Sequence, residues 1–145
     1  MTTVRTKAVF ALIAAFALVL AGCGGGDVGG SDDSAAATEL EIRMDSFFFD
    51  PADTTVVADT DIDLSVLNLD ASLQHNWVII NPGSEISDEA DFDESDILYE
   101  TSEVEPNASA TGTFSVAAGE YQVICTIPGH FSAGMKGTLT AVAES

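Results

Sequence analysis

Four side chains able to bind a transition metal occur in the order His, Cys, His and Met along the chain. Cys125, His130 and Met135 follow one another at intervals of five residues within the stretch CTIPGHFSAGM, and His75 lies fifty residues before the cysteine. A thiolate, two imidazoles and a weak thioether are the donors of a mononuclear copper site with a trigonal His₂Cys plane and a long axial sulfur. Sulfur donors suit Cu(I), and imidazole suits copper generally. The spacing therefore predicts one copper ion per chain, able to exchange single electrons.

The cysteine count supports a metal role for Cys125. The chain has a positively charged start, an apolar run over residues 8–20 that is too short to span a membrane, and then the triplet Ala-Gly-Cys23. This pattern is typical of a secretory signal, and it resembles the lipobox of prokaryotic lipoproteins, in which the cysteine becomes the lipid-bearing N-terminus. We expect a signal peptide over residues 1–22 and lipidation of Cys23, which would anchor the protein to the outer face of the cell membrane. Cys125 then lacks a disulfide partner, and metal ligation accounts for an unpaired thiol in an exported protein.

The composition is strongly acidic, with 24 Asp and Glu against four Lys and Arg and a formal net charge of −20. All of the acids follow Cys23, whereas only Arg43 and Lys136 of the basic residues do. The electrostatic repulsion from so much negative charge makes nucleic acid and anionic lipid surfaces poor partners. Two interpretations stay open: solvation of the kind expected in a high-salt organism, and a docking face for a basic redox partner. The even spread of acids along the chain favours solvation.

The rest of the sequence predicts one all-β domain. Residues 23–37 are rich in Gly, Ser and Asp and are expected to form a flexible, lipid-anchored linker. Over residues 38–145, short segments alternate apolar and polar residues between turn residues, which predicts a Greek-key β-sandwich of seven to eight strands. Residues 84–105 are an acidic insertion with ten carboxylates, compatible with either a short helix or a loop.

Two predicted strands and a turn decide the geometry of the site. The apolar residues 75–80 predict a central strand that carries His75. The alternation that begins at Gly119 places Cys125 at the end of a strand, facing the core. A Pro-Gly pair then turns the chain and brings the second histidine back toward the sulfur. Earlier in the domain, a change of phase at Leu67 predicts a β-bulge.

The segment QHNWV at residues 74–78, together with CTIPGH and GMKGTLT at residues 125–130 and 134–140, resembles cupredoxins of the azurin and auracyanin type. The resemblance extends over residues 38–142. It implies that His75, Cys125 and His130 are the equatorial copper ligands. It implies Met135 as the axial ligand.

The resemblance also implies roles for two neighbours of the first histidine. Gln74 offers its backbone carbonyl as a fifth contact from the opposite pole, although azurins usually have Gly there. Asn76 ties the two ligand segments together and donates toward the sulfur of the ligand cysteine. Azurin's N-terminal disulfide is absent, and the spacing from His130 to Met135 is closer to that of auracyanin.

Other classes of metal protein fit the sequence less well. Zinc also binds Cys and His, but it does not call for an axial thioether. A multicopper enzyme needs further histidines and a binuclear copper site needs a second cysteine, whereas the chain has two His and two Cys, one of them expected to be lipidated. Copper-delivery proteins usually have exposed Met-rich or Cys-rich sites. We therefore expect an electron carrier that is not an enzyme, with a copper carrier or delivery protein at the cell envelope as the alternative.

The sequence around His130 predicts where electrons leave. We expect one edge of the His130 ring to reach the surface within a small, uncharged docking patch, which in an acidic protein indicates an interaction site. The predicted patch consists of Ile127, Pro128, Phe131 and Ala133. The expected partners are redox proteins such as cytochromes, a quinol-oxidising complex or a terminal oxidase, and the protein is expected to be a monomer.

Overall fold

The computed structural model describes residues 36–144, so the predicted signal peptide, the lipidation site Cys23 and most of the linker lie outside the described residues. Ala37 already pairs with Val56, one residue before the predicted start of the domain. No helix among the described residues is long and apolar enough to cross a membrane. Within this range the chain forms nine strands: β1 (Glu39–Asp45), β2 (Phe48–Asp50), β3 (Asp53–Val57), β4 (Ile62–Asn68), β5 (Val78–Ile80), β6 (Ile97–Glu100), β7 (Ser109–Phe114), β8 (Gly119–Ile124) and β9 (Lys136–Val142).

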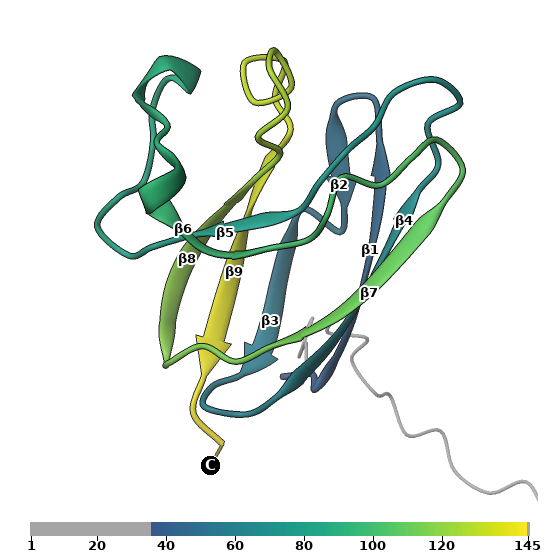
Figure 1. The fold of residues 1–145 in the computed structure, drawn as a ribbon. Coiled ribbons are helices and arrows are strands. Elements are labelled where there is room, and N and C mark those ends of the chain that lie inside the picture. The colour runs from purple at the N-terminus through teal and green to yellow at the C-terminus, as the bar shows by residue number, and fades with distance from the viewer. Residues whose placement is uncertain (1–35, 145) are drawn as a thin grey trace, which may run out of the picture. The chain divides into compact units, whose positions relative to one another are not determined.

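The strands form two sheets that pack face to face, as predicted for a Greek-key β-sandwich (Figure 1). One sheet has the order β2-β1-β4-β7 and the other has the order β3-β9-β8-β5-β6. Both sheets are mixed, because β1 runs parallel to β4 and β3 runs parallel to β9, while the other neighbours are antiparallel. The predicted fold class is confirmed, with nine strands where seven to eight were expected.

The core lies between the two sheets and follows the two-residue period of the strands. In β1 the apolar residues Leu40, Ile42 and Met44 are buried and their neighbours are more exposed. Trp77 packs against Phe114 with ring centroids 5.7 Å apart. Burying each large aliphatic or aromatic side chain of this kind contributes about 1.5–3 kcal/mol, so the sheets form a rigid support for the loops at their ends.

The predicted bulge in β4 is wrong. The strand keeps its period of two to its end, where Asn68 is fully buried and Leu69 is 48% exposed. The apparent change of phase arose because an inward position is occupied by a polar residue, whose side-chain amide donates to the carbonyls of Leu73 and Val104. The irregular register lies elsewhere, between Ile79 and Ile80 where β5 pairs with β6.

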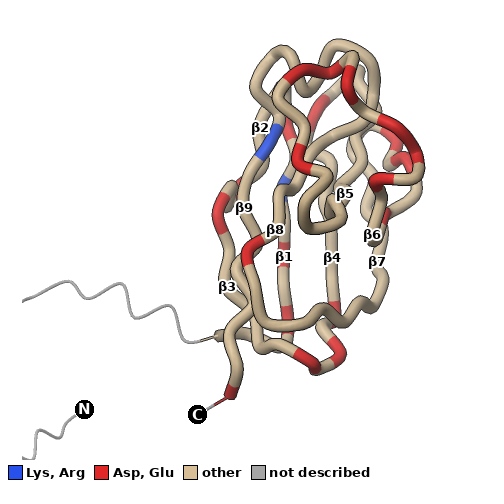
Figure 2. The backbone as a smooth tube through the Cα atoms, turned by 90° about the vertical axis from the view of Figure 1, so that its left-hand side faces the viewer, with Lys and Arg blue, Asp and Glu red and all other residues tan. Residues whose placement is uncertain are grey.

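The predicted strand over residues 75–80 is shorter than expected. His75 lies before β5 and pairs with Val104 in an isolated antiparallel bridge. The acidic insertion contains both short helical turns and a strand: η1 (Glu89–Asp91) and η2 (Glu94–Asp96) are single 3₁₀ turns, and β6 follows. Asp and Glu residues lie on loops at both ends of the sandwich (Figure 2).

Candidate metal centre

Three of the four predicted ligands meet at one end of the sandwich. The Nδ1 atoms of His75 and His130 are 3.1 Å apart, and the Sγ atom of Cys125 is 3.4 Å from Nδ1 of His130. One donor atom from each of the three residues lies within 4.8 Å of the others. His75 and Cys125 are inaccessible to solvent, and His130 is 6% exposed. The donors therefore converge on one small volume that is almost free of water.

The hairpin between β8 and β9 fixes two ligands and the predicted axial residue. Cys125 directly follows β8, and its backbone N–H donates to the carbonyl of Met135 at 3.1 Å. The N–H of Met135 in turn donates to the carbonyl of His130 at 3.0 Å. Gly134 has a φ of +111°, a conformation that residues with a Cβ rarely adopt. The side chain of Met135 is fully buried in the same core cluster as Cys125.

The segment before β5 supplies the other histidine and a link between the two ligand segments. The amide Nδ2 of Asn76 donates to Oγ1 of Thr126 at 2.7 Å, and the N–H of Thr126 donates to Oδ1 of Asn76 at 2.9 Å. The backbone N–H groups of Asn76 and Ile127 both donate toward the sulfur of Cys125. Asn76 thus holds the residues on either side of the site in register. The carbonyl of Gln74 stays a predicted contact, and its side chain donates to Glu105 at 2.5 Å.

Burial controls the protonation of the three donors. It raises the pKa of the Cys125 thiol, which the N–H groups directed at the sulfur partly oppose. Burial also lowers the pKa of His75, and for His130 the neighbouring His75 adds to the effect of burial. Both imidazoles are therefore neutral near pH 7, with a lone pair free for a metal. The buried thiol gives up its proton when a metal cation offsets the cost of a buried thiolate.

The donor set fits copper. Nitrogen atoms 3.1 Å apart, and nitrogen and sulfur 3.4 Å apart, can share one ion at metal–nitrogen and metal–sulfur bond lengths of about 2.0 and 2.3 Å. One thiolate and two imidazoles also suit zinc, but a buried thioether beside them is the weak axial donor of a copper site. His75, Cys125 and His130 would hold the ion, with Met135 nearby.

The predicted docking patch is partly wrong. Phe131 is 5% exposed and packs into a second apolar cluster beside Ile124, so it offers no contact surface. A two-residue period does not apply within the ligand loop, and its apolar residues therefore gave no signal of which side they face. Pro128 and Ala133 are exposed and Ile127 is half-buried.

Sequence reasoning missed an aromatic neighbour of the site. Phe47, in the turn between β1 and β2, contacts His130 edge-on with ring centroids 5.0 Å apart, and it is half-buried. Its position among three consecutive phenylalanines gave no signal that distinguished it from core residues.

The acidic insertion contacts the ligand loop through Glu89 in η1. Its Oε1 accepts the N–H of Gly129 at 2.5 Å, and its Oε2 accepts the hydroxyl of Ser132 at 2.5 Å. Gly129 and Ser132 lie on either side of His130 within the ligand loop, so one carboxylate fixes this loop from outside. The hydroxyl of Ser132, followed by the N–H of Gly129, lowers the pKa of Glu89 below its ordinary value of 4.5.

Comparison with known proteins identifies the class. Residues 36–142 match the family of copper-binding proteins of the plastocyanin/azurin type. The chain therefore belongs to this family, the cupredoxins. Within it the chain is of the auracyanin type. It is 32% identical to auracyanin-A of Chloroflexus aurantiacus over 90% of this chain and 93% of that protein. It is also 32% identical to auracyanin-B of the same organism, over 76% of this chain and 54% of the relative.

Solved structures agree with this assignment. The reduced auracyanin of Roseiflexus castenholzii superposes with a TM-score of 0.64 at 28% identity, covering 74% of this chain and 98% of that one. A reduced rusticyanin superposes with a TM-score of 0.58 at 18% identity over 74% of this chain and 81% of its own, a likeness that concerns the fold alone.

The two sulfur ligands should respond differently to substitution. We expect Cys125→Ser to abolish the intense blue or blue-green absorption of the Cu(II) protein, because a poorly ionised hydroxyl replaces the thiolate. Met135→Leu should keep the colour and raise the reduction potential, because loss of a weak axial donor favours Cu(I). Visible spectra and redox titration of the copper-loaded variants measure both effects. Equal effects of the two substitutions would contradict the assignment of equatorial and axial roles.

The contact between Glu89 and the ligand loop should depend on pH. Because the folded state lowers the pKa of Glu89, the contact is fully present above pH 4.5 and is lost as the pH falls through the lowered pKa. The backbone N–H of Ser132 also donates to Oε2 of Glu89, at 3.3 Å. Amide exchange at Gly129 and Ser132, corrected for the intrinsic rate, should therefore accelerate below pH 4.5. Glu89→Gln should accelerate it already at neutral pH, whereas Glu94→Gln in the next 3₁₀ turn should leave it unchanged. Protection in Glu89→Gln equal to that of the native protein would refute the contact.

Proposed function

We propose that this protein carries single electrons between redox partners at one type-1 copper centre. The observation that supports the proposal most directly is the convergence of three donor atoms in a buried volume, fixed from two separate parts of a rigid sandwich. Copper bound there would supply the redox chemistry by alternating between Cu(I) and Cu(II). The protein's contribution is to keep the donors in one arrangement for both oxidation states, so that little rearrangement opposes transfer.

Specific contacts limit movement of the ligands. His75 exchanges two backbone hydrogen bonds with Val104, at 3.2 and 2.8 Å, and Asn76 connects this segment to Thr126. The loop that carries His130 is closed by the backbone hydrogen bond from Cys125 to Met135. It is held from outside by Glu89. Burial excludes water, which would otherwise offer a ligand to the oxidised ion and change its coordination.

The alternative is a copper carrier or delivery protein, and the burial of the donors weighs against it. Transfer of copper between proteins needs a donor that the acceptor's ligands can reach, and Cys125 is fully buried. Two measurements on the purified, copper-loaded protein separate the functions. An electron carrier should show a blue band that is bleached by a reductant within the time of mixing and should keep its copper against a chelator. Rapid loss of copper to the chelator with slow reduction would favour delivery.

Electrons are proposed to leave through His130, the one ligand of the three that solvent reaches. The exposed residues near it in the loop include Pro128 and Ala133, Ile127 is half-buried and Phe47 lies against the ring. The carboxylate of Glu89, bonded to Gly129 and Ser132, adds one negative charge beside this surface. We propose that a cytochrome, a quinol-oxidising complex or a terminal oxidase docks there as donor or acceptor of the monomeric protein. The acidic surface would steer its approach and make the rate depend on salt.

The site of action is proposed to be the outer face of the cell membrane. The lipobox-like triplet that ends at Cys23 supports this location, with residues 23–37 as a tether between lipid and domain. Residues 24–37, rich in Gly and Ser, would give the domain a reach of roughly 20 Å from its lipid.

A charge placed beside His130 should slow electron exchange. Ala133→Asp should lower the rate of self-exchange at least about fivefold, since two like charges about 4 Å apart in water cost about 1 kcal/mol. The matched control is Ala118→Asp, an exposed alanine just before β8 and therefore at the opposite end of that strand from Cys125. Both variants should keep the native visible spectrum. Equal self-exchange rates in the two variants would show that electrons leave by another surface.

Removal of the lipidation residue should release the protein from the membrane. Cys23→Ser should leave the chain unprocessed or soluble, because a serine accepts no lipid at this position. Membrane fractionation and the mass of the mature N-terminus measure the outcome. A native protein with no lipid on its N-terminus would contradict the proposed anchor.

A further inference from the structure

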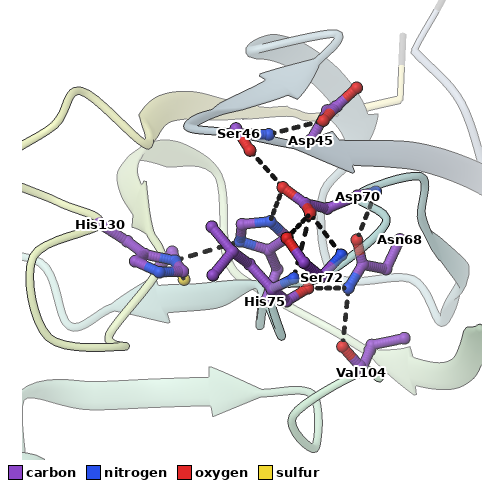
Figure 3. A network of polar contacts seen from close by, with 10 residues as sticks. Asp45, Ser46, Asn68, Asp70, Ser72, His75, Val104 and His130 are labelled. Atoms are coloured by element: carbon purple, nitrogen blue, oxygen red, sulfur yellow. Dashed lines mark hydrogen bonds and ion pairs between the residues drawn. The ribbon is translucent and has the colours of Figure 1, made fainter. Parts of the chain in front are cut away.

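A buried carboxylate lies behind the ligand His75. Asp70 is the second residue after β4, is 5% exposed, and belongs to a polar network next to the metal centre (Figure 3). Its position follows from the parallel pairing of β1 and β4, in which Met44 is opposite Asn68. The C-terminal ends of two neighbouring parallel strands lie at the same edge of a sheet. The residues just after them, Ser46 and Asp70, are therefore neighbours.

The two oxygens of Asp70 have different environments. Oδ1 accepts the backbone N–H groups of Ser72 and Leu73 at 2.8 and 3.0 Å, and it also accepts the hydroxyl of Ser72 at 3.2 Å. Oδ2 accepts the hydroxyl of Ser46 and faces Nε2 of His75 at 3.6 Å. A carboxylate oxygen has about two lone-pair sites, so Oδ2 has capacity for one more donor. The backbone bonds to Oδ1 fix which oxygen faces the histidine.

The two ring nitrogens of His75 face different surroundings, the metal centre and Asp70. Its Nδ1 points toward His130 and the metal centre, whereas Nε2 is buried and has no hydrogen-bond partner within the described residues. The 3.6 Å between Nε2 and Asp70 is longer than a hydrogen bond, so the interaction in this structure is electrostatic. A buried N–H is costly when it is unpaired, and among the described residues the Asp70 carboxylate is the acceptor that faces it.

We infer that Asp70 is a positioning residue that keeps the proton of His75 on Nε2, leaves the lone pair of Nδ1 free for the metal, and favours Cu(II) over Cu(I). The charge is the reason for the last effect, because an anion behind the imidazole strengthens its donation and stabilises the more positive ion. The effect on the copper ion rests on the proposed electron-transfer function. The effect on the tautomer of His75 does not, since it concerns the metal-free protein.

The substitution Asp70→Asn inverts the polarity of this contact with almost no change of shape. Because two backbone N–H groups donate to the Oδ1 position, the carbonyl oxygen of the asparagine should occupy it. Its NH₂ group then occupies the position of Oδ2 and faces Nε2 of His75 as a donor. A donor there requires Nε2 to be the acceptor, which moves the proton to Nδ1, where it competes with the metal.

The test uses the full chain in two forms. In the metal-free protein, ¹⁵N shifts of the histidine rings should show the Nε2–H tautomer of His75 in the native chain and the Nδ1–H tautomer in Asp70→Asn. In the copper-loaded protein, Asp70→Asn should lower the affinity for Cu(II) relative to Cu(I) about tenfold, which raises the reduction potential by about 59 mV for one electron. Both readouts differ from what a loss of stability alone would produce.

Two further variants serve as controls. Asp45→Asn removes a carboxylate from the same network, where it accepts the N–H of Ser46. It should shift the potential much less than Asp70→Asn and leave the tautomer unchanged. Ser46→Ala removes the hydroxyl from Oδ2 and keeps the charge, so the potential should fall. An unchanged tautomer in Asp70→Asn, or a potential shift no larger than that of Asp45→Asn, would overturn the inference. If Asp70→Asn does not fold, a potential in Ser46→Ala that rises or stays the same would overturn it.

Discussion

The structure depends on keeping three metal donors close together in a volume without water. The Nδ1 atoms of two buried, neutral imidazoles lie within hydrogen-bond distance of each other, at 3.1 Å, and a thiol beside them is costly to ionise while it is buried. Such an arrangement does not form for its own stability, so the surrounding sandwich has to stabilise it. The fully buried core between the two sheets supplies the free energy, and a bound cation would offset the cost of a buried thiolate.

The link between the two ligand segments explains how the sandwich holds the site. One segment precedes β5, the other joins β8 to β9, and β5 and β8 are neighbours in the same sheet. The reciprocal contact of Asn76 and Thr126 extends this pairing beyond the ends of the strands. Substitutions that disturb the pairing of β5 with β8, at Val78 with Ile124 or Ile79 with Val123, would therefore change the separation of the donors although none of these residues is a ligand.

The sequence predicted the fold class and the metal better than it predicted the surroundings of the site. Alternation marked the main strands, and the order and types of His75, Cys125, His130 and Met135 indicated copper because few other metals use that combination. Periodicity failed where a buried position is polar, at Asn68, and where no regular element exists, at Phe131. Contacts between distant segments left no local signal: nothing in the spacing of Ser46, Asp70 and Glu89 indicates that they lie beside the ligands.

The distribution of the ligands along the chain has a consequence for folding. Cys125 and His130 are five residues apart, whereas 55 residues separate His75 from His130. The entropic cost of closing a loop grows with the logarithm of its length, so the free energy of joining the distant pair is about 2 kcal/mol higher than that of joining the near pair. This difference favours an order of assembly in which the hairpin residues meet first and the segment before β5 closes over them later. A metal ion present during folding would then meet Cys125, His130 and the predicted axial residue Met135 before the sandwich excludes solvent, and its capture would reduce the entropic cost of the long-range closure.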